Sequence, residues 1–180
     1  MTYIIGFCGG PGIAKSTTAA DVYAKLKQNA RNVEYIPEFA KTLTWAKDFE
    51  TLKFQEYVTC TQQYNQNIMV GQVEAVITDS PIITGLMYYK ETNKKIRSAF
   101  EDYILESFKA QKNILFLLKR VKGYLKVGRT QSLEEAIEID VKIKRFLDDN
   151  YINYIEIDGN EEGANKAFEI VKRCLSRKSS

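Results

Sequence analysis

The stretch IIGFCGGPGIAKSTTAADVYAKL, residues 4–26, decides the fold of this chain. It begins with an apolar run, passes through a glycine-rich turn and ends in residues with helical periodicity. The turn follows the pattern G-x-x-x-x-G-K-[ST], except that Ala14 replaces the last glycine. The stretch therefore predicts a buried strand that leads through a tight loop directly into a helix.

A loop of this kind is suited to hold the phosphates of a nucleotide. Its main-chain N–H groups surround the phosphates, and the positive end of the helix dipole attracts them. We expect Lys15 to contact the β- and γ-phosphate oxygens, Ser16 to ligate Mg²⁺ and Thr17 to lie near the α-phosphate. The predicted nucleotide-binding residues are Gly10, Pro11, Gly12, Ile13, Ala14, Lys15, Ser16 and Thr17.

Ala14 is the one departure from the pattern. Its Cβ restricts the positive φ and the close backbone approach that glycine allows. Alanine is the smallest alternative, however, and it favours helix at the point where the helix is expected to start. We therefore expect a working phosphate site, and not a glycine-rich turn that binds nothing.

Apolar runs alternate with helical patterns along the rest of the chain. Strands are predicted at 3–8, 33–37, 74–79, 113–118 and 151–157, and helices at 16–29, 39–47, 53–70, 83–110 (broken near 91–93), 132–149 and 162–176. This alternation predicts a mostly parallel five-stranded sheet flanked by helices, in a single α/β domain over residues 1–180.

Composition excludes several classes of protein. The chain has 180 residues and a net charge of +3, which is too small to indicate nucleic-acid or membrane binding by itself. It contains no histidine, so Ser-His triads and His-based zinc sites are excluded. Three widely spaced cysteines, Cys8, Cys60 and Cys174, predict free thiols and a cytoplasmic location. No segment is apolar over the roughly 20 residues that span a membrane, so no membrane partner is expected.

Two carboxylates follow predicted strands, at the sheet edge where open α/β folds bind ligands. Asp79, in ITDSP, is expected to hold the magnesium shell or to receive the proton of the phosphate acceptor; a simple strand-ending turn is the alternative. Glu38, in PEFAK, is expected to act as a base or to bind a substrate hydroxyl, and stabilisation of the next helix is its alternative role. Lys41 follows one helical turn later, and we expect it either to pair with Glu38 or to contact an anion.

A basic segment, LKRVKGYLKVGRTQSLEEA at 118–136, follows the fourth strand and ends in the capping-box pattern Ser132-x-x-Glu135. Residues of about 119–131 are expected to form a lid over the transferring phosphates, with Arg120 and Arg129 stabilising their charge and Tyr124 contacting substrate. The alternatives are a solvated loop and a contact with a nucleic-acid backbone.

The helix predicted at 53–70 is rich in glutamine and aromatic residues. Gln55, Gln62 and Gln63 are candidates for reading the edge of a base, and Gln63 is the substrate-binding prediction among them. Phe54 or Tyr64 would then stack on that base. Aromatic residues at helical spacing are more often part of the core.

Together, GGPGIAKSTTA, PEFAK, ITDSP and the lid-and-helix segment occur in the order found in small P-loop kinases of bacteriophage genomes, which the chain resembles over roughly residues 3–158. The resemblance implies ATP and Mg²⁺ as cofactors. It also implies that Lys15, Ser16 and Thr17 hold phosphates and metal, that Asp79 and Glu38 are the strand-end acids, and that Arg129 is the lid arginine. Such kinases act on nucleosides or nucleotides, and related ones phosphorylate hydroxymethyluracil within phage DNA.

We therefore expect an ATP- and magnesium-dependent phosphotransferase that acts on a hydroxyl or phosphate of a nucleoside or nucleotide. A kinase of 5-hydroxymethyluracil within phage DNA, working in the host cytoplasm, is the alternative enzyme. A nucleotide-dependent ATPase or switch without a phosphorylated acceptor, and a binding module that Ala14 has inactivated, are the alternatives of other classes.

Overall fold

Five parallel strands form the centre of the protein. The computed structural model describes residues 2–121 and 132–176, and in this part of the chain the strands are arranged in the order β2-β3-β1-β4-β5 with every pairing parallel. The strands are β1 (Tyr3–Cys8), β2 (Val33–Ile36), β3 (Ala75–Thr78), β4 (Lys112–Lys119) and β5 (Ile155–Asp158). The expected sheet is confirmed, and it is parallel throughout these five strands.

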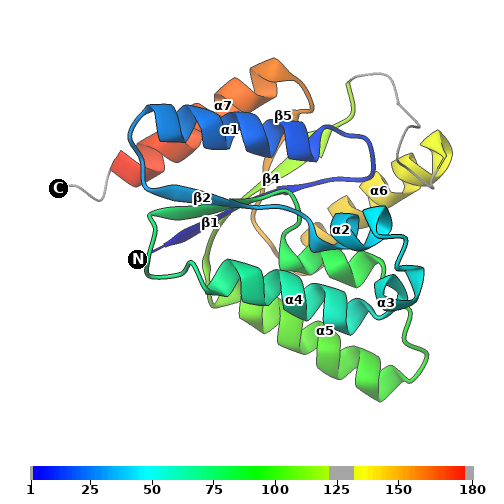
Figure 1. Ribbon diagram of the computed structural model, residues 1–180. Coiled ribbons are helices and arrows are strands. Elements are labelled where there is room, and N and C mark those ends of the chain that lie inside the picture. The colour runs from blue at the N-terminus through cyan, green and yellow to red at the C-terminus, as the bar shows by residue number, and fades with distance from the viewer. Residues whose placement is uncertain (1, 122–131, 177–180) are drawn as a thin grey trace.

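Helices cover both faces of the sheet (Figure 1). On one face, α1 (Lys15–Gln28) packs against α7 (Glu161–Ser176). The other face carries α4 (Gln55–Asn67), the 3₁₀ helix η1 (Ile82–Met87), α5 (Lys94–Lys109) and α6 (Leu133–Asp149). Two short helices, α2 (Phe39–Trp45) and α3 (Phe49–Lys53), connect β2 to α4. A parallel sheet requires this double cover because its strands are apolar on both sides.

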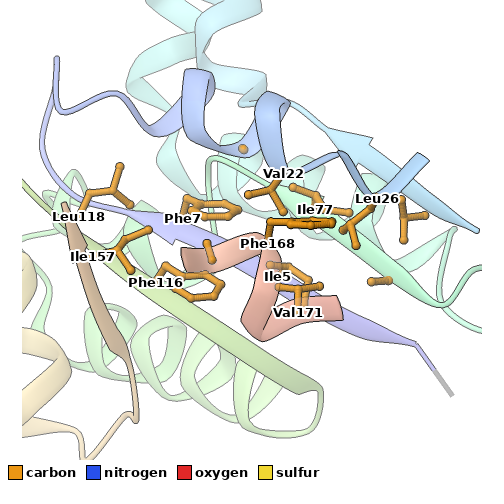
Figure 2. Close-up of a cluster of buried hydrophobic side chains, with 14 of the residues drawn as sticks. Ile5, Phe7, Val22, Leu26, Ile77, Phe116, Leu118, Ile157, Phe168 and Val171 are labelled. Atoms are coloured by element: carbon orange, nitrogen blue, oxygen red, sulfur yellow. The ribbon is translucent and has the colours of Figure 1, made fainter. Parts of the chain in front are cut away.

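Alternation of side chains along the strands divides the core into two layers. Ile5 and Phe7 point to the α1–α7 side, where Phe7 stacks on Phe116 at a ring-centroid distance of 5.2 Å. Figure 2 shows this layer, with side chains of both helices lying against the strands. Cys8 and Leu117 belong to the opposite layer with η1, α5 and α6. Since each such buried apolar side chain contributes about 1.5–3 kcal/mol, the two layers fix the sheet firmly in place.

The structure differs from the sequence prediction at the start of the fifth strand and just before α4. The fifth strand starts at Ile155, not at residue 151, because α6 ends in a left-handed turn at Tyr151 (φ 53°). The break predicted within 83–110 is confirmed, because η1 ends at Met87 and α5 begins at Lys94; Asn93 caps α5 by accepting from the Lys95 and Ile96 N–H groups. The extra helix α3 precedes α4, and Asp48 caps it by accepting from the Thr51 N–H group. The predicted capping box at Ser132 and Glu135 is present.

The strand order brings the predicted site residues to one edge. Neighbours β1 and β3 end at Cys8 and Thr78, and β2, next to β3, ends at Ile36. The glycine-rich loop, Asp79 and Glu38 follow these three ends directly. None of the helices within the described residues combines the length and the apolar composition needed to cross a membrane.

Candidate active site

The glycine-rich loop delivers an open helix N-terminus to the sheet edge. Helix α1 begins at Lys15, its N-cap Ala14 forms no side-chain cap hydrogen bond, and its first turn contains no acidic residue. The first N–H groups of a helix have no intrahelical partner. Because no side chain of α1's cap occupies them, the positive end of this helix is available to an anion such as a phosphate.

Ala14 adopts a left-handed conformation, with φ 74° and ψ 21°. The expectation that alanine is favoured here as a helix former is therefore wrong, because the residue lies outside the helix in a region that glycine tolerates better. The loop nevertheless keeps the glycine-like geometry that the phosphate pattern requires. Alanine at this position costs some stability and does not abolish the loop's shape.

Two side chains of the loop region have contacts that help to fix its shape. Ile13 is buried in the α1–α7 core layer, which anchors the loop from behind. The Lys15 ammonium donates to the Gly10 carbonyl oxygen at 3.0 Å and so lies folded over the loop. Ser16 and Thr17 belong to the first turn of α1, as the sequence predicts. The predicted phosphate residues thus lie in one continuous segment, from the loop after β1 to the first turn of α1.

An ion pair that sequence reasoning missed braces this cradle. Asp140, on α6, accepts from the Gly10 N–H group at 2.5 Å and from Arg120 Nε at 3.0 Å. Arg120 also donates from Nη2 to the Pro11 carbonyl oxygen at 3.0 Å. Gly10 itself permits the contact, because a Cβ there would approach both Asp140 Oδ1 and the Ala136 carbonyl oxygen to 2.6 Å.

The brace changes the role of two predicted residues. The Gly10 N–H group already donates to a carboxylate, so it supports the loop and is not directed at a nucleotide phosphate in this form. Arg120 is next to the loop, as a lid arginine should be, but its guanidinium is paired with Asp140. The sequence contained one indication of this ion pair. Asp140 lies on the buried side of α6 with Ala136, Ile143 and Leu147, where a charged residue is unusual.

A cleft of about 540 Å³, including its open mouth, extends from the loop towards α4 and η1. Lys15, Glu38 and Asp79 all line it. Asp79 is only 1% exposed, and its Oδ1 accepts from the Glu38 N–H group at 2.9 Å. This bond ties the two strand-end acids together, so the loop cation and both predicted carboxylates face one space.

Glu38 has the electrostatic properties of a general base. Burial raises the pKa of its carboxyl, the nearby Lys15 ammonium lowers it, the Asp79 charge raises it again and Lys41 lowers it. A carboxylate with a raised pKa accepts a proton more readily near neutral pH than an ordinary glutamate does. Lys41 is exposed on α2 and acts on Glu38 only through its charge; it is not among the residues that line the cleft.

The glutamines of α4 have structural partners. Gln62 Oε1 accepts from the Phe39 N–H group at 2.9 Å, and its Nε2 donates to Thr78 Oγ1 at 3.2 Å. Gln63 is buried, accepts from Tyr103 on α5 and is not brought to the cleft. Gln55 does line the cleft. The amide of Gln62 therefore holds α2 and β3 in register and contributes little to reading a base.

Several predicted residues lie outside the part that the structure describes. These are Tyr124 and Arg129, together with the remainder of the predicted lid from residue 122 to residue 131. Tyr88, which sequence reasoning did not select, lines the cleft. Partial burial and the charges of Glu38 and Asp140 raise the pKa of Tyr88 to about 12, so it stays a neutral O–H donor at physiological pH.

The residues at this edge fit a magnesium ion that a nucleotide brings with it. Within residues 2–121 and 132–176, no group of three acidic, cysteine or histidine side chains forms a metal site of its own. Mg²⁺ commonly binds through one or two protein oxygens together with substrate phosphates and water. The hydroxyl of Ser16, in the first turn of α1, and the buried carboxylate of Asp79, just after β3, provide such oxygens.

Comparisons with known proteins agree with this geometry. A family model described as an AAA domain matches residues 4–163, and the chain belongs to that family. A shikimate kinase from Bacteroides thetaiotaomicron has a similar structure, with a TM-score of 0.54, 11% sequence identity, and coverage of 97% of this chain and 98% of that chain. Comparison with curated proteins gave no match. The protein thus has a P-loop kinase fold.

Proposed function

We propose that this protein is a magnesium- and ATP-dependent phosphotransferase that transfers the γ-phosphoryl group to a nucleoside or nucleotide. One observation carries the proposal. The uncapped N-terminus of α1, with its Lys15, opens into the same cleft as the paired carboxylates Glu38 and Asp79. Phosphoryl transfer needs just these two parts, a cradle for the donor phosphates and an acid that receives the acceptor's proton.

Each residue has a definite part in the proposed reaction. The amides that open α1 and the Lys15 ammonium would neutralise charge on the transferring group. Ser16 and Asp79 would hold Mg²⁺, which supplies further charge neutralisation when bound. Glu38 would accept the acceptor's proton, while Arg120, paired with Asp140, would hold the loop in place from the side of β4.

A kinase of 5-hydroxymethyluracil within phage DNA is the second candidate, and one surface favours it. Trp45 is 73% exposed and Phe54 is 67% exposed, and Tyr57 is exposed as well. Exposed aromatic rings stack on the bases of single-stranded nucleic acid. Trp45 lies on α2, Phe54 between α3 and α4, and Tyr57 on α4. Residues of α2 and α4, Ala40 and Gln55, line the cleft.

A transfer assay tests the proposal. The protein is incubated with Mg²⁺ and γ-labelled ATP together with nucleosides, nucleoside monophosphates and single-stranded DNA that contains 5-hydroxymethyluracil. We expect label on one class of acceptor. Release of labelled phosphate at the same rate with and without every acceptor would overturn the kinase proposal and favour an ATPase or switch, the alternative suggested by the AAA-domain family.

A further inference from the structure

Within the part of the chain that the structure describes, the cleft beyond the phosphate loop has little positive charge. Among its lining residues that the structure describes, Lys15 is the one cation, and it belongs to the donor side. Two carboxylates, Glu38 and Asp79, face the same space, and the Asp79 side chain is almost completely buried. The rest of the described lining is uncharged, with apolar residues from α4 and η1 such as Val58 and Ile82.

This distribution of charge disfavours an acceptor that brings its own phosphate into the cleft. Unit charges at close range in a partly desolvated space interact far more strongly than in water. A phosphate beside Glu38 and Asp79 would be repelled, and it would find no arginine or second lysine in the described lining to bind it. A neutral hydroxyl suffers no such repulsion and can donate a hydrogen bond to Glu38.

The part of the cleft lined by α4 contains a buried polar group without a hydrogen-bond partner among the described residues. Thr59, on α4, lines the cleft and is 3% exposed, and its Oγ1 has no hydrogen-bond partner among the described residues. Gly85, on η1, also lines the cleft, and a Cβ there would come within 2.2 Å of this oxygen. A buried hydroxyl without a partner is unfavourable, so a ligand that supplies one is favoured.

We propose, on the basis of the kinase function proposed above, that the acceptor is a nucleoside and not a nucleoside monophosphate, because the group that enters the cleft is an uncharged hydroxyl. Thr59 contributes to the recognition of this acceptor by a hydrogen bond. In the transfer, the bond between the γ-phosphorus and the β–γ bridging oxygen breaks, and ADP leaves with that electron pair. The acceptor oxygen forms the new bond to phosphorus, and its proton passes to the Glu38 carboxylate. The product is a phosphate monoester.

The chemical form of the product tests the acceptor class. The protein is incubated with Mg²⁺ and ATP and with one acceptor at a time. The acceptors are thymidine, deoxycytidine, deoxyadenosine and deoxyguanosine, the 5′-monophosphates of these nucleosides, free 5-hydroxymethyldeoxyuridine, and an oligonucleotide that contains 5-hydroxymethyldeoxyuridine. Phosphorus NMR of the product distinguishes a monoester from a phosphoanhydride. We expect a monoester, with the nucleoside preferred over its monophosphate by about tenfold or more in kcat/KM. A phosphoanhydride product would overturn this inference and leave the kinase function intact, whereas phosphate release without any labelled acceptor would overturn both.

Variants of Thr59 test the specificity residue. Thr59→Val keeps the shape of the side chain and removes its hydroxyl, so we expect the KM for the acceptor to rise about tenfold while the KM for ATP stays within about twofold. Thr59→Ser should restore the acceptor KM. Thr61→Val, on the same helix but away from the cleft lining, is the matched control. Equal rises in both KM values, or no rescue by serine, would show that Thr59 serves packing alone and overturn its assignment.

Discussion

The cleft has a donor half, formed mainly by main-chain groups, and an acceptor half, formed mainly by side chains. The donor half is mainly main chain: amides at the start of α1, carbonyl oxygens that accept from Lys15 and Arg120, and one brace from Asp140. The acceptor half is made of residues from α2, α4, η1 and α6 and from the segments that follow β2 and β3, with Glu38 and Thr59 among them. Main-chain geometry depends on a short local pattern, whereas the acceptor half depends on how distant elements pack. Substitutions should therefore affect the two halves in different ways.

The largest effect is expected at Lys15, in the donor half. Lys15→Ala removes the ammonium from the cradle, and we expect kcat to fall by about 10³-fold, since a charge aimed at the transferring phosphoryl group is lost. Lys25→Ala, on the same helix and paired with Asp21, is the matched control and should keep normal turnover. Circular dichroism and thermal unfolding should show that both variants fold. Normal turnover of Lys15→Ala would refute the donor site.

Next in size is Glu38, in the acceptor half. Glu38→Gln should lower kcat by about 10²–10³-fold, because the acceptor's proton loses its base, while calorimetry should find unchanged binding of Mg·ATP. Glu34→Gln, on β2 and paired with Lys27, is the control. Reduced ATP affinity without a change in kcat would instead place Glu38 in the donor half.

The pH profile gives an independent test of Glu38. Since burial raises the pKa of its carboxyl, the residue is protonated, and inactive as a base, at pH values where an ordinary glutamate is still ionised. Activity should therefore fall as pH drops through a value above the usual glutamate range, and this acid limb should be absent from the residual activity of Glu38→Gln. A limb that persists in the variant would belong to another group.

A smaller effect is expected at the brace between the loop and α6. Asp140→Asn keeps an oxygen for the Gly10 N–H group but removes the charge that holds Arg120, so kcat/KM for ATP should fall by about tenfold, the size of one charge-assisted hydrogen bond. Asp148→Asn, on the same helix but paired with Lys144, is the control. An equal loss of kcat/KM in both variants would mean that the substitutions disturb α6 in general and not the contact with the loop.

The smallest effect concerns the left-handed alanines. Ala14→Gly should stabilise the protein by about 0.5–1 kcal/mol. Glycine removes the steric cost of a Cβ at positive φ, and this gain exceeds the entropy that glycine adds to the unfolded state. Ala30→Gly, with φ 56° beyond the end of α1, offers the same relief away from the site. Both should raise Tm by about 1–4 °C. A fall in stability for Ala14→Gly alone would mean that its Cβ makes a favourable contact.

Sequence patterns were sufficient for the features that depend on neighbouring residues. The order of strands and helices, the loop between β1 and α1, the capping box at Ser132 and the acids after β2 and β3 all follow from local patterns, and the structure contains them. The sequence prediction made β5 too long. The apolar residue Ile152 extends the strand pattern, but in the structure it precedes β5 and packs in the core layer that contains α6. Periodicity alone does not distinguish these two uses of an apolar residue.

The sequence by itself determined that a phosphate-cradling loop exists, because a loop closed by its own main chain needs only the right residues in the right order. Tertiary structure decided what surrounds that loop. It brought Asp140 to Gly10, 130 positions away in the chain, and bonded the Glu38 N–H group to Asp79. It also gave the Gln62 amide a partner in the Phe39 N–H group, and left the Thr59 hydroxyl without a partner among the described residues. These contacts join residues far apart in the chain, so their geometry is fixed by the packing of helices on the sheet and not by any local pattern.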